Sequence, residues 1–214
     1  MKILSFDTSN SLASVSIIED SKILSYNITK HSSQQAEKLF ELIKQSLNDA
    51  NAVLDDIDLL MVTNGPGSFT GVRVGLAAAL GIKTASKKMV KSISNFQVLA
   101  WKARELFPNK NKIAVILDAR REQLYFQMFD INLNPINDPS LIMLDEINKY
   151  LAEDIIFIGD GIKFLPGEYF NENLNIITNA EILSKASEFY WNNGGYNDLI
   201  PLYIRQPDAL EPKK

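Results

Sequence analysis

A glycine-rich turn after an apolar, strand-like run is the segment whose residue types could bind an anion. It reads Gly65-Pro66-Gly67-Ser68-Phe69-Thr70-Gly71. Backbone N–H groups at the start of a following helix, together with a Ser68 hydroxyl, could hold a phosphate. The glycine spacing is one residue too long for the dinucleotide fingerprint, and no Gly-Lys-Ser/Thr ends the turn as in a P-loop. Phosphate contact through Gly65, Gly67 and Ser68 is therefore a hypothesis and not a motif assignment.

Two aspartates that end apolar segments could serve the same chemistry. Asp7 is followed by Thr8 and Ser9, and Asp118 ends the later apolar run Lys112–Asp118. Carboxylates in such positions can orient a metal–phosphate complex. The alternative interpretation is structural, with each carboxylate accepting hydrogen bonds from the turn that follows it. Both interpretations stay open at this level.

The composition excludes several classes of catalytic site. The chain has no cysteine and one histidine, His31. Disulfides, thiolate nucleophiles, zinc–thiolate centres and paired-histidine metal motifs are therefore excluded. A Ser–His–Asp triad would have to recruit His31 from a distance, and nothing local supports one. We expect His31 to cap a helix or pack at the surface.

The elements that position these residues follow from the apolar periodicity. Residues 2–8, 13–17 and 22–29 predict an antiparallel meander of three strands. A helix from about 33 to 48 follows, with an apolar stripe that includes Phe40. The remaining expected elements are strands at 59–63, 90–93, 112–118, 123–131 and 155–159, helices at about 69–86, 95–106, 144–151 and 179–191, and a loop at 132–139.

The order of these elements repeats weakly between the two halves of the chain. Each half has a strand ending in aspartate, a turn, a second strand, and then helix, strand, glycine turn and helix. This predicts an α/β fold of two related lobes, residues 1–108 and 109–214, each a mixed sheet with flanking helices. By analogy, duplicated lobes of this kind are typical of actin-like ATPases and sugar kinases. The tail from Gly194, rich in proline, is expected to be irregular and could dock on a partner.

One face of the helix expected after the glycine turn carries small residues. Gly71, Gly75, Ala78 and Ala79 fall at i, i+4, i+7 and i+8, which places them together. Glycine inside a helix costs about 1 kcal/mol relative to alanine, so close approach of another backbone or a ligand is the expected reason. We predict that these residues and Ile82 contact a partner protein, with a tight helix–sheet contact inside this chain as the equally weighted alternative.

Charge is distributed unevenly along the chain. The net charge is -4, yet no acidic residue lies between Asp58 and Glu105. The basic residues of that block include Lys87, Lys88 and Lys91. A positive face for a polyanion such as tRNA and a solvated helix surface are the two interpretations.

The chain contains no stretch suited to cross a membrane. Its longest apolar run, Val74–Ile82, is far short of the roughly 20 residues that a bilayer requires. Asp7 interrupts the first apolar run too early for a secretory signal. Cytoplasmic localisation is the simplest expectation.

Five segments together resemble the TsaB (YeaZ) family. They are Ile3-Leu4-Ser5-Phe6-Asp7-Thr8-Ser9, His31-Ser32, Asn64-Gly65-Pro66-Gly67-Ser68-Phe69-Thr70-Gly71-Val72-Arg73-Val74-Gly75, Asp118-Ala119-Arg120 and Pro201-Leu202-Tyr203-Ile204-Arg205. The resemblance extends over nearly the whole chain, and the segment around Gly65–Arg73 is its most specific part.

This resemblance implies an actin-like (ASKHA, RNase H-like) fold with a reduced second lobe. It implies a non-catalytic subunit that binds TsaD, the subunit that transfers the threonylcarbamoyl group to tRNA beside the anticodon, in a complex that includes the ATPase TsaE. TsaD carries an H-x-x-x-H metal pair, whereas this chain has glutamine four residues after His31, at Gln35. We therefore expect no metal and no intrinsic cofactor, with ATP or ADP bound, if at all, in the assembled complex. Our own hypothesis is that the chain forms a homodimer when TsaD is absent.

Two other functions remain open from the sequence. One is a free-standing enzyme, either an ATPase or kinase of the same fold or a glycopeptidase. The other is an interaction module with no connection to tRNA. In the first case Asp7 would be essential for turnover.

Overall fold

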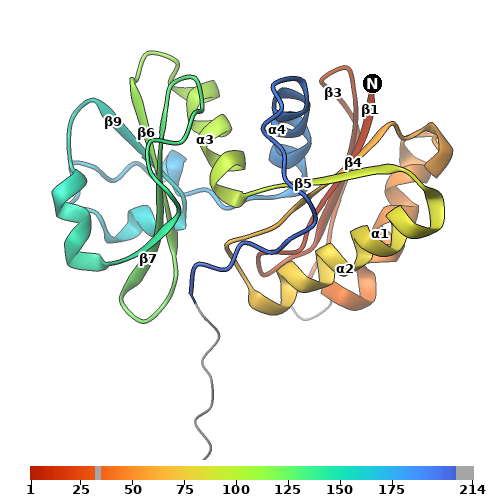
Figure 1. Ribbon diagram of the computed structural model, residues 1–214, viewed down its shortest axis with the longest axis horizontal. Coiled ribbons are helices and arrows are strands. Elements are labelled where there is room, and N and C mark those ends of the chain that lie inside the picture. Colours follow the sequence, from red (N-terminus) through yellow and green to blue (C-terminus); the bar gives the residue numbers. More distant parts are fainter. Residues whose placement is uncertain (32–34, 206–214) are drawn as a thin grey trace, which may run out of the picture.

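The computed structural model describes residues 1–31 and 35–205, whose strands form two sheets that stand side by side (Figure 1). The first sheet has the order β3-β2-β1-β4-β5, in which β1 pairs antiparallel with β2 and parallel with β4. Its strands are β1 (Lys2–Asp7), β2 (Ser14–Glu19), β3 (Lys22–Ile28), β4 (Leu59–Thr63) and β5 (Met89–Ile93). This is a mixed sheet, as expected for the first lobe.

The second sheet repeats the start of this arrangement. Its order, β8-β7-β6-β9, matches β3-β2-β1-β4 position by position, and β6 again has one antiparallel and one parallel neighbour. The strands are β6 (Lys112–Asp118), β7 (Gln123–Asp130), β8 (Ser140–Met143) and β9 (Ile155–Ile158). The predicted pair of related mixed sheets is therefore confirmed.

The second sheet has four strands where the first has five, and 3-10 helices follow its strands β8 and β9. The helix expected at about 144–151 is the 3-10 helix η3 (Leu144–Tyr150), and η4 (Asp160–Phe164) and η5 (Glu172–Leu174) follow β9. Strand β8 lies in a stretch to which the sequence pattern assigned no element.

Four α-helices of the described residues flank the sheets, and side-chain caps define where three of them begin. Helices α1 (Gln35–Asp49) and α2 (Phe69–Ser86) cover one face of the first sheet. Ser68 caps α2, Ser94 and Gln97 form a capping box at the start of α3 (Asn95–Leu106), and Asn179 caps α4 (Ala180–Asn192). The expected start of α1 at Ser33 lies outside the described residues.

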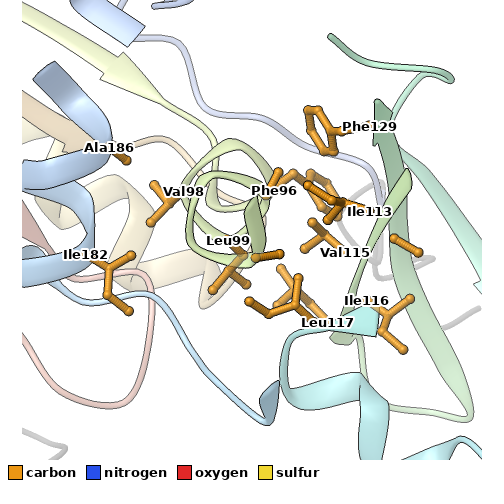
Figure 2. Packing of buried hydrophobic residues seen from close by; sticks show 14 of the residues in the cluster. Phe96, Val98, Leu99, Ile113, Val115, Ile116, Leu117, Phe129, Ile182 and Ala186 are labelled. Atoms are coloured by element: carbon orange, nitrogen blue, oxygen red, sulfur yellow. The ribbon is translucent and has the colours of Figure 1, made fainter. Parts of the chain in front are cut away.

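Helices α3 and α4 stand between the two sheets and join their cores (Figure 1). On α3, Val98 points toward Ile182 of α4, whereas Phe96 lies toward Ile113 and Val115 of β6 (Figure 2). All five side chains are at least nine-tenths buried and belong to one apolar cluster that extends through both lobes. A second cluster lies under α1 and α2.

The chain therefore crosses between the lobes more than once. The lobe boundary at residue 108 stays a prediction, but α4, which lies beyond it, packs on β1 and β2 of the first sheet. The irregular tail also returns to this sheet. Asn197 and Ser92 of β5 exchange backbone hydrogen bonds of 2.7 and 3.0 Å, and the Leu202 N–H donates to the Asn64 carbonyl at 2.8 Å. The tail thus docks on its own chain through residue 205, while Pro207 and Pro212 lie outside the described residues.

Helix α1 differs from the expected pattern at Phe40. Its buried side consists of Leu39, Leu42 and Ile43, all below 9% exposed, whereas Phe40 is 57% exposed. Only one side of α1 meets the sheet, and Phe40 lies about 100° around the helix from Leu39. Phe40, which was expected in the apolar stripe of this helix, therefore lies outside its buried side.

The small-residue face of α2 packs inside the chain. A Cβ added at Gly71 would lie 1.9 Å from the Thr8 carbonyl oxygen, and one at Gly75 would lie 2.6 Å from Thr8 Oγ1. Thr8 Oγ1 also donates to the Gly71 carbonyl at 2.7 Å. Ala78 and Ala79 are buried at 8% and 0% exposure. At Gly71 and Gly75 the structure favours the alternative, a tight contact inside the chain with Thr8 just after β1. A partner interface at these four residues and at the partly buried Ile82 stays a prediction.

We expect Gly71→Ala and Gly81→Ala to change stability in opposite directions. The added methyl group at Gly71 collides with the Thr8 carbonyl and should lower the free energy of unfolding by about 3 kcal/mol or more. At Gly81 nothing lies within 4 Å of an added Cβ, so alanine should raise stability by about 1 kcal/mol. Urea denaturation measures both, and equal effects at the two positions would contradict this packing.

Candidate functional site

The carboxylate of Asp7, at the end of β1, is the centre of a buried hydrogen-bond network. Its Oδ1 accepts from the Ser9 N–H at 2.8 Å, from Ser9 Oγ at 2.6 Å and from Thr63 Oγ1 at 2.6 Å. Its Oδ2 accepts from Asn10 Nδ2 at 3.0 Å and from Thr178 Oγ1 at 3.1 Å. Asp7 is 1% exposed. The carboxylate is therefore shared among the turn after β1, the end of β4 and the segment before α4.

A second layer of contacts closes the same network from α3. Asn95 Nδ2 donates to Ser9 Oγ at 2.8 Å and to the Pro66 carbonyl at 2.7 Å. Ser9 Oγ in turn donates to Asp7. The Ser9 hydroxyl, which the sequence analysis placed beside a possible phosphate, thus donates its hydrogen bond to the buried Asp7 carboxylate.

The glycine turn is closed onto the turn after β1. The Ser68 N–H donates to the Ser9 carbonyl at 2.7 Å, and a Cβ at Gly67 would lie 2.4 Å from that same oxygen. Gly65 has a φ of +103°, which few residues other than glycine adopt, and its carbonyl accepts from the Asn95 N–H. Gly65 and Gly67 thus allow the glycine turn to pack closely against the turn after β1 and the start of α3.

An open cleft of about 580 Å³ lies between the lobes in front of this network. Its lining brings together Ser9, Gly67, Ser68 and Asp118, while Asp7, Thr8 and Gly65 lie behind it. The predicted residues therefore divide into a group at the cleft and a group in the buried layer. The cleft also contains Arg120 and Arg205, which the sequence analysis did not assign to a site.

Electrostatics at the second-lobe wall of the cleft are set by two aspartates and a lysine. Partial burial works to raise the pKa of Asp118, but the 2.7 Å hydrogen bond from Lys163 Nζ and the N–H of Arg120 lower it below its usual range. Burial raises the pKa of Asp160, whose Oδ1 accepts from the Asp118 N–H at 2.9 Å. The Asp118 carboxylate thus accepts hydrogen bonds from the turn that follows it and from Lys163 of η4. This is the structural role that the sequence analysis gave as the alternative to phosphate binding.

The side chains of Arg120 and Arg205 also interact with residues of the second lobe that line the cleft or lie next to it. Arg120 Nη1 lies 3.1 Å from Asp118 Oδ2, and Arg205 donates to the side chain of Gln123 and to the Arg120 carbonyl. Arg120 has a φ of +62°. The run of three residues with positive φ at 120–122 gives no signal in residue type. The sequence analysis therefore named Arg120 only in a family segment and did not assign it to the cleft.

The three lysines predicted to contact tRNA differ in their surroundings. Lys91 Nζ pairs with Asp198 at 2.8 Å, and Lys88 Nζ donates to the Asp55 carbonyl at 2.6 Å. Lys87 is exposed at the left-handed residue that ends α2. Lys91 lowers the pKa of the Asp198 carboxyl through their hydrogen bond. Direct tRNA contact stays a prediction, and Lys87 is its best-placed residue.

The outward faces of α1 and α2 carry large apolar side chains. Phe40 and Leu80 are 57% and 55% exposed. Ala77 and Gly81 flank Leu80 on the exposed side of α2, and the space beside Gly81 is open. This surface is independent of the glycine face that packs on Thr8.

The described part of the chain offers neither a metal cluster nor a membrane span. Residues 1–31 and 35–205 contain no group of three or more histidine, cysteine, aspartate or glutamate side chains arranged to hold a metal ion. None of their helices has the length and apolar character needed to cross a bilayer.

Comparison with known proteins gives consistent matches. Residues 27–165 match the family described as TsaD: tRNA N6-adenosine threonylcarbamoyltransferase. The chain is 30% identical to the tRNA threonylcarbamoyladenosine biosynthesis protein TsaB of Buchnera aphidicola subsp. Schizaphis graminum, over 78% of this chain and 81% of that protein. It is 25% identical to the TsaB of Bacillus subtilis, over 74% of this chain and 71% of that protein.

A solved structure supports the same fold. The crystal structure of an uncharacterized protein with similarity to the peptidase YeaZ, from Pseudomonas aeruginosa, superimposes with a TM-score of 0.80 at 22% identity. The match covers 95% of this chain and 99% of the other.

Asp7→Asn should destabilise the fold, because an amide N–H₂ would replace an oxygen that accepts from buried donors. We expect a loss of about 3 kcal/mol in the free energy of unfolding. The matched control is Asp55→Asn, at a side chain that is 94% exposed, where the change should stay within about 0.5 kcal/mol. Chemical denaturation compares the two variants, and equal stabilities would show that the Asp7 network contributes little.

Proposed function

The chain belongs to the TsaB (YeaZ) family of tRNA threonylcarbamoyladenosine biosynthesis proteins, and from this premise we propose that it is a non-catalytic subunit of the complex that forms this nucleoside. It binds a TsaD-like catalytic subunit and helps to assemble it with a TsaE-like ATPase on tRNA, which places it in the cytoplasm. Two relatives named for this pathway and the match to the TsaD family support the assignment.

The observation that carries the non-catalytic role is the state of Asp7. An aspartate that positions a metal–phosphate complex needs carboxylate lone pairs directed at the ligand. Here both oxygens accept from donors of the same chain. The turn that would cradle a phosphate is likewise closed on Ser9. These contacts favour a structural role for residues that the fold class otherwise uses for nucleotide chemistry, so ATP or ADP is proposed only for the assembled complex.

The surface that we assign to the TsaD-like partner is the outward side of α1 and α2. Phe40 and Leu80 expose large apolar side chains there. The small residues Ala77 and Gly81 leave room for an opposing helix. Because each buried side chain of this size contributes roughly 1.5–3 kcal/mol, a pair of such helices can supply much of a stable interface. A second copy of the chain can occupy the same surface when the partner is absent.

Depletion of this protein should lower threonylcarbamoyladenosine in tRNA, and purified protein alone should not turn over threonylcarbamoyl-adenylate. Mass spectrometry of digested tRNA measures the first effect, and product formation with and without the TsaD-like subunit measures the second. Unchanged nucleoside levels would favour an interaction module outside this pathway. Turnover by the isolated chain, lost in a folded Asp7 variant, would favour the free-standing enzyme.

The double variant Phe40→Asp/Leu80→Asp should lose the TsaD-like partner while remaining folded. Placing two carboxylates in an apolar interface should weaken the affinity by about a hundredfold or more. The control is Met143→Asp, an apolar residue of the second lobe that is 42% exposed. Analytical ultracentrifugation gives the affinities, and an unchanged affinity of the double variant would place the interface elsewhere.

A further inference from the structure

The second sheet ends in an apolar strand whose outer side carries no strand partner among the described residues. Strand β9 (Ile155–Ile158) is last in the order β8-β7-β6-β9 and pairs only with β6. A groove of about 830 Å³ lies along it, between β9 and the segment 168–174. Exposed strand edges next to a groove are sites where an extended peptide can add as a further strand.

The hydrogen bonds at the two ends of β9 indicate which backbone groups face this groove. The Ile155 N–H donates to the Ala152 carbonyl and the Gly159 N–H to the Leu174 carbonyl, so both point away from β6. Successive residues of a strand direct their N–H and C=O groups to opposite sides. The N–H and C=O of Phe157, midway between them, are therefore directed away from β6, to the side on which the groove lies.

The walls of the groove combine apolar and acidic side chains. Phe170 is 42% exposed, and the partly buried Tyr169 stands edge-on to Phe157 at 5.9 Å between ring centroids. Three exposed glutamates, Glu153, Glu168 and Glu172, line the groove, and none forms an ion pair with a described residue through its carboxylate. The one basic residue of the lining, Lys110, is directed to the Glu153 carbonyl at 2.6 Å.

We propose that this groove binds an extended peptide segment of another protein, with alternating apolar and basic residues, which pairs with Phe157 as an added strand. The apolar side chains of the peptide lie against Tyr169 and Phe170, and its lysine or arginine side chains meet Glu168 and Glu172. A second copy of this chain is a poorer occupant, because edge-to-edge pairing would bring the same glutamates of two molecules together. The site is in the second lobe and is separate from the α1–α2 surface assigned to the TsaD-like partner.

The test uses the full chain and two synthetic hexapeptides, Lys-Val-Lys-Ile-Lys-Val and its glutamate counterpart Glu-Val-Glu-Ile-Glu-Val, both blocked at their ends. Calorimetric titration should give saturable binding of the lysine peptide only. Amide hydrogen exchange followed by NMR should slow at Phe157 when that peptide is bound. The charge-reversal variant Glu168→Lys/Glu172→Lys should bind it at least about tenfold more weakly.

A matched variant separates local contacts from overall charge. Asp138→Lys/Asp145→Lys changes two exposed carboxylates that flank β8 at the opposite edge of the same sheet, and it should bind the lysine peptide as the wild type does. The proposal is overturned if the lysine peptide does not bind, if Phe157 exchange is unaffected, or if both charge variants lose affinity equally. A dimer detected by sedimentation, with amide exchange at Phe157 slowing as it forms, would likewise replace the peptide with a second copy.

Discussion

The buried carboxylate of Asp7 is the constraint on which the first lobe depends. A charge removed from water must be compensated, and here the compensation comes from hydroxyl, amide and backbone donors on three segments far apart in sequence. The end of β1, the end of β4 and the approach to α4 are therefore fixed relative to one another. Ser9 extends the same network to Asn95 at the start of α3, so both helices between the lobes are positioned from this one group.

This arrangement fits the scaffold role that we propose for the chain. The donors and acceptors that would meet a phosphate are used to hold two turns together, as in the contact between Ser68 and Ser9. The glycines of α2 let that helix lie directly on Thr8. On the outer side of the first sheet, α1 and α2 present Phe40 and Leu80 outward. A surface held in place by contacts beneath it suits the proposed task of docking a catalytic partner.

Periodicity and turn chemistry predicted most of the fold, and the repeat predicted both sheets. Strand ends such as Asp7 and Asp118 were located correctly because apolar runs stop there. The sequence could not reveal that Thr178 reaches Asp7, since the contact spans 171 positions and a threonine has no distinguishing signal. Nor could the spacing of Gly71 and Gly75 indicate which backbone approaches them. The spacing of small residues along the sequence shows that one face of the helix lacks large side chains. Only the tertiary fold shows which part of the protein packs on that face.

The return of the tail to β5 bears on how the molecule acquires its structure during synthesis. The first sheet is built from the earliest residues, yet Ser92 and Asn64 receive their backbone partners from residues 197 and 202, and β1 is covered by α4. The amino-terminal half consequently lacks part of its cover until nearly all described residues have left the ribosome. A chain that ends before residue 178 would lack α4, and the side of the first sheet on which α4 packs would then be uncovered.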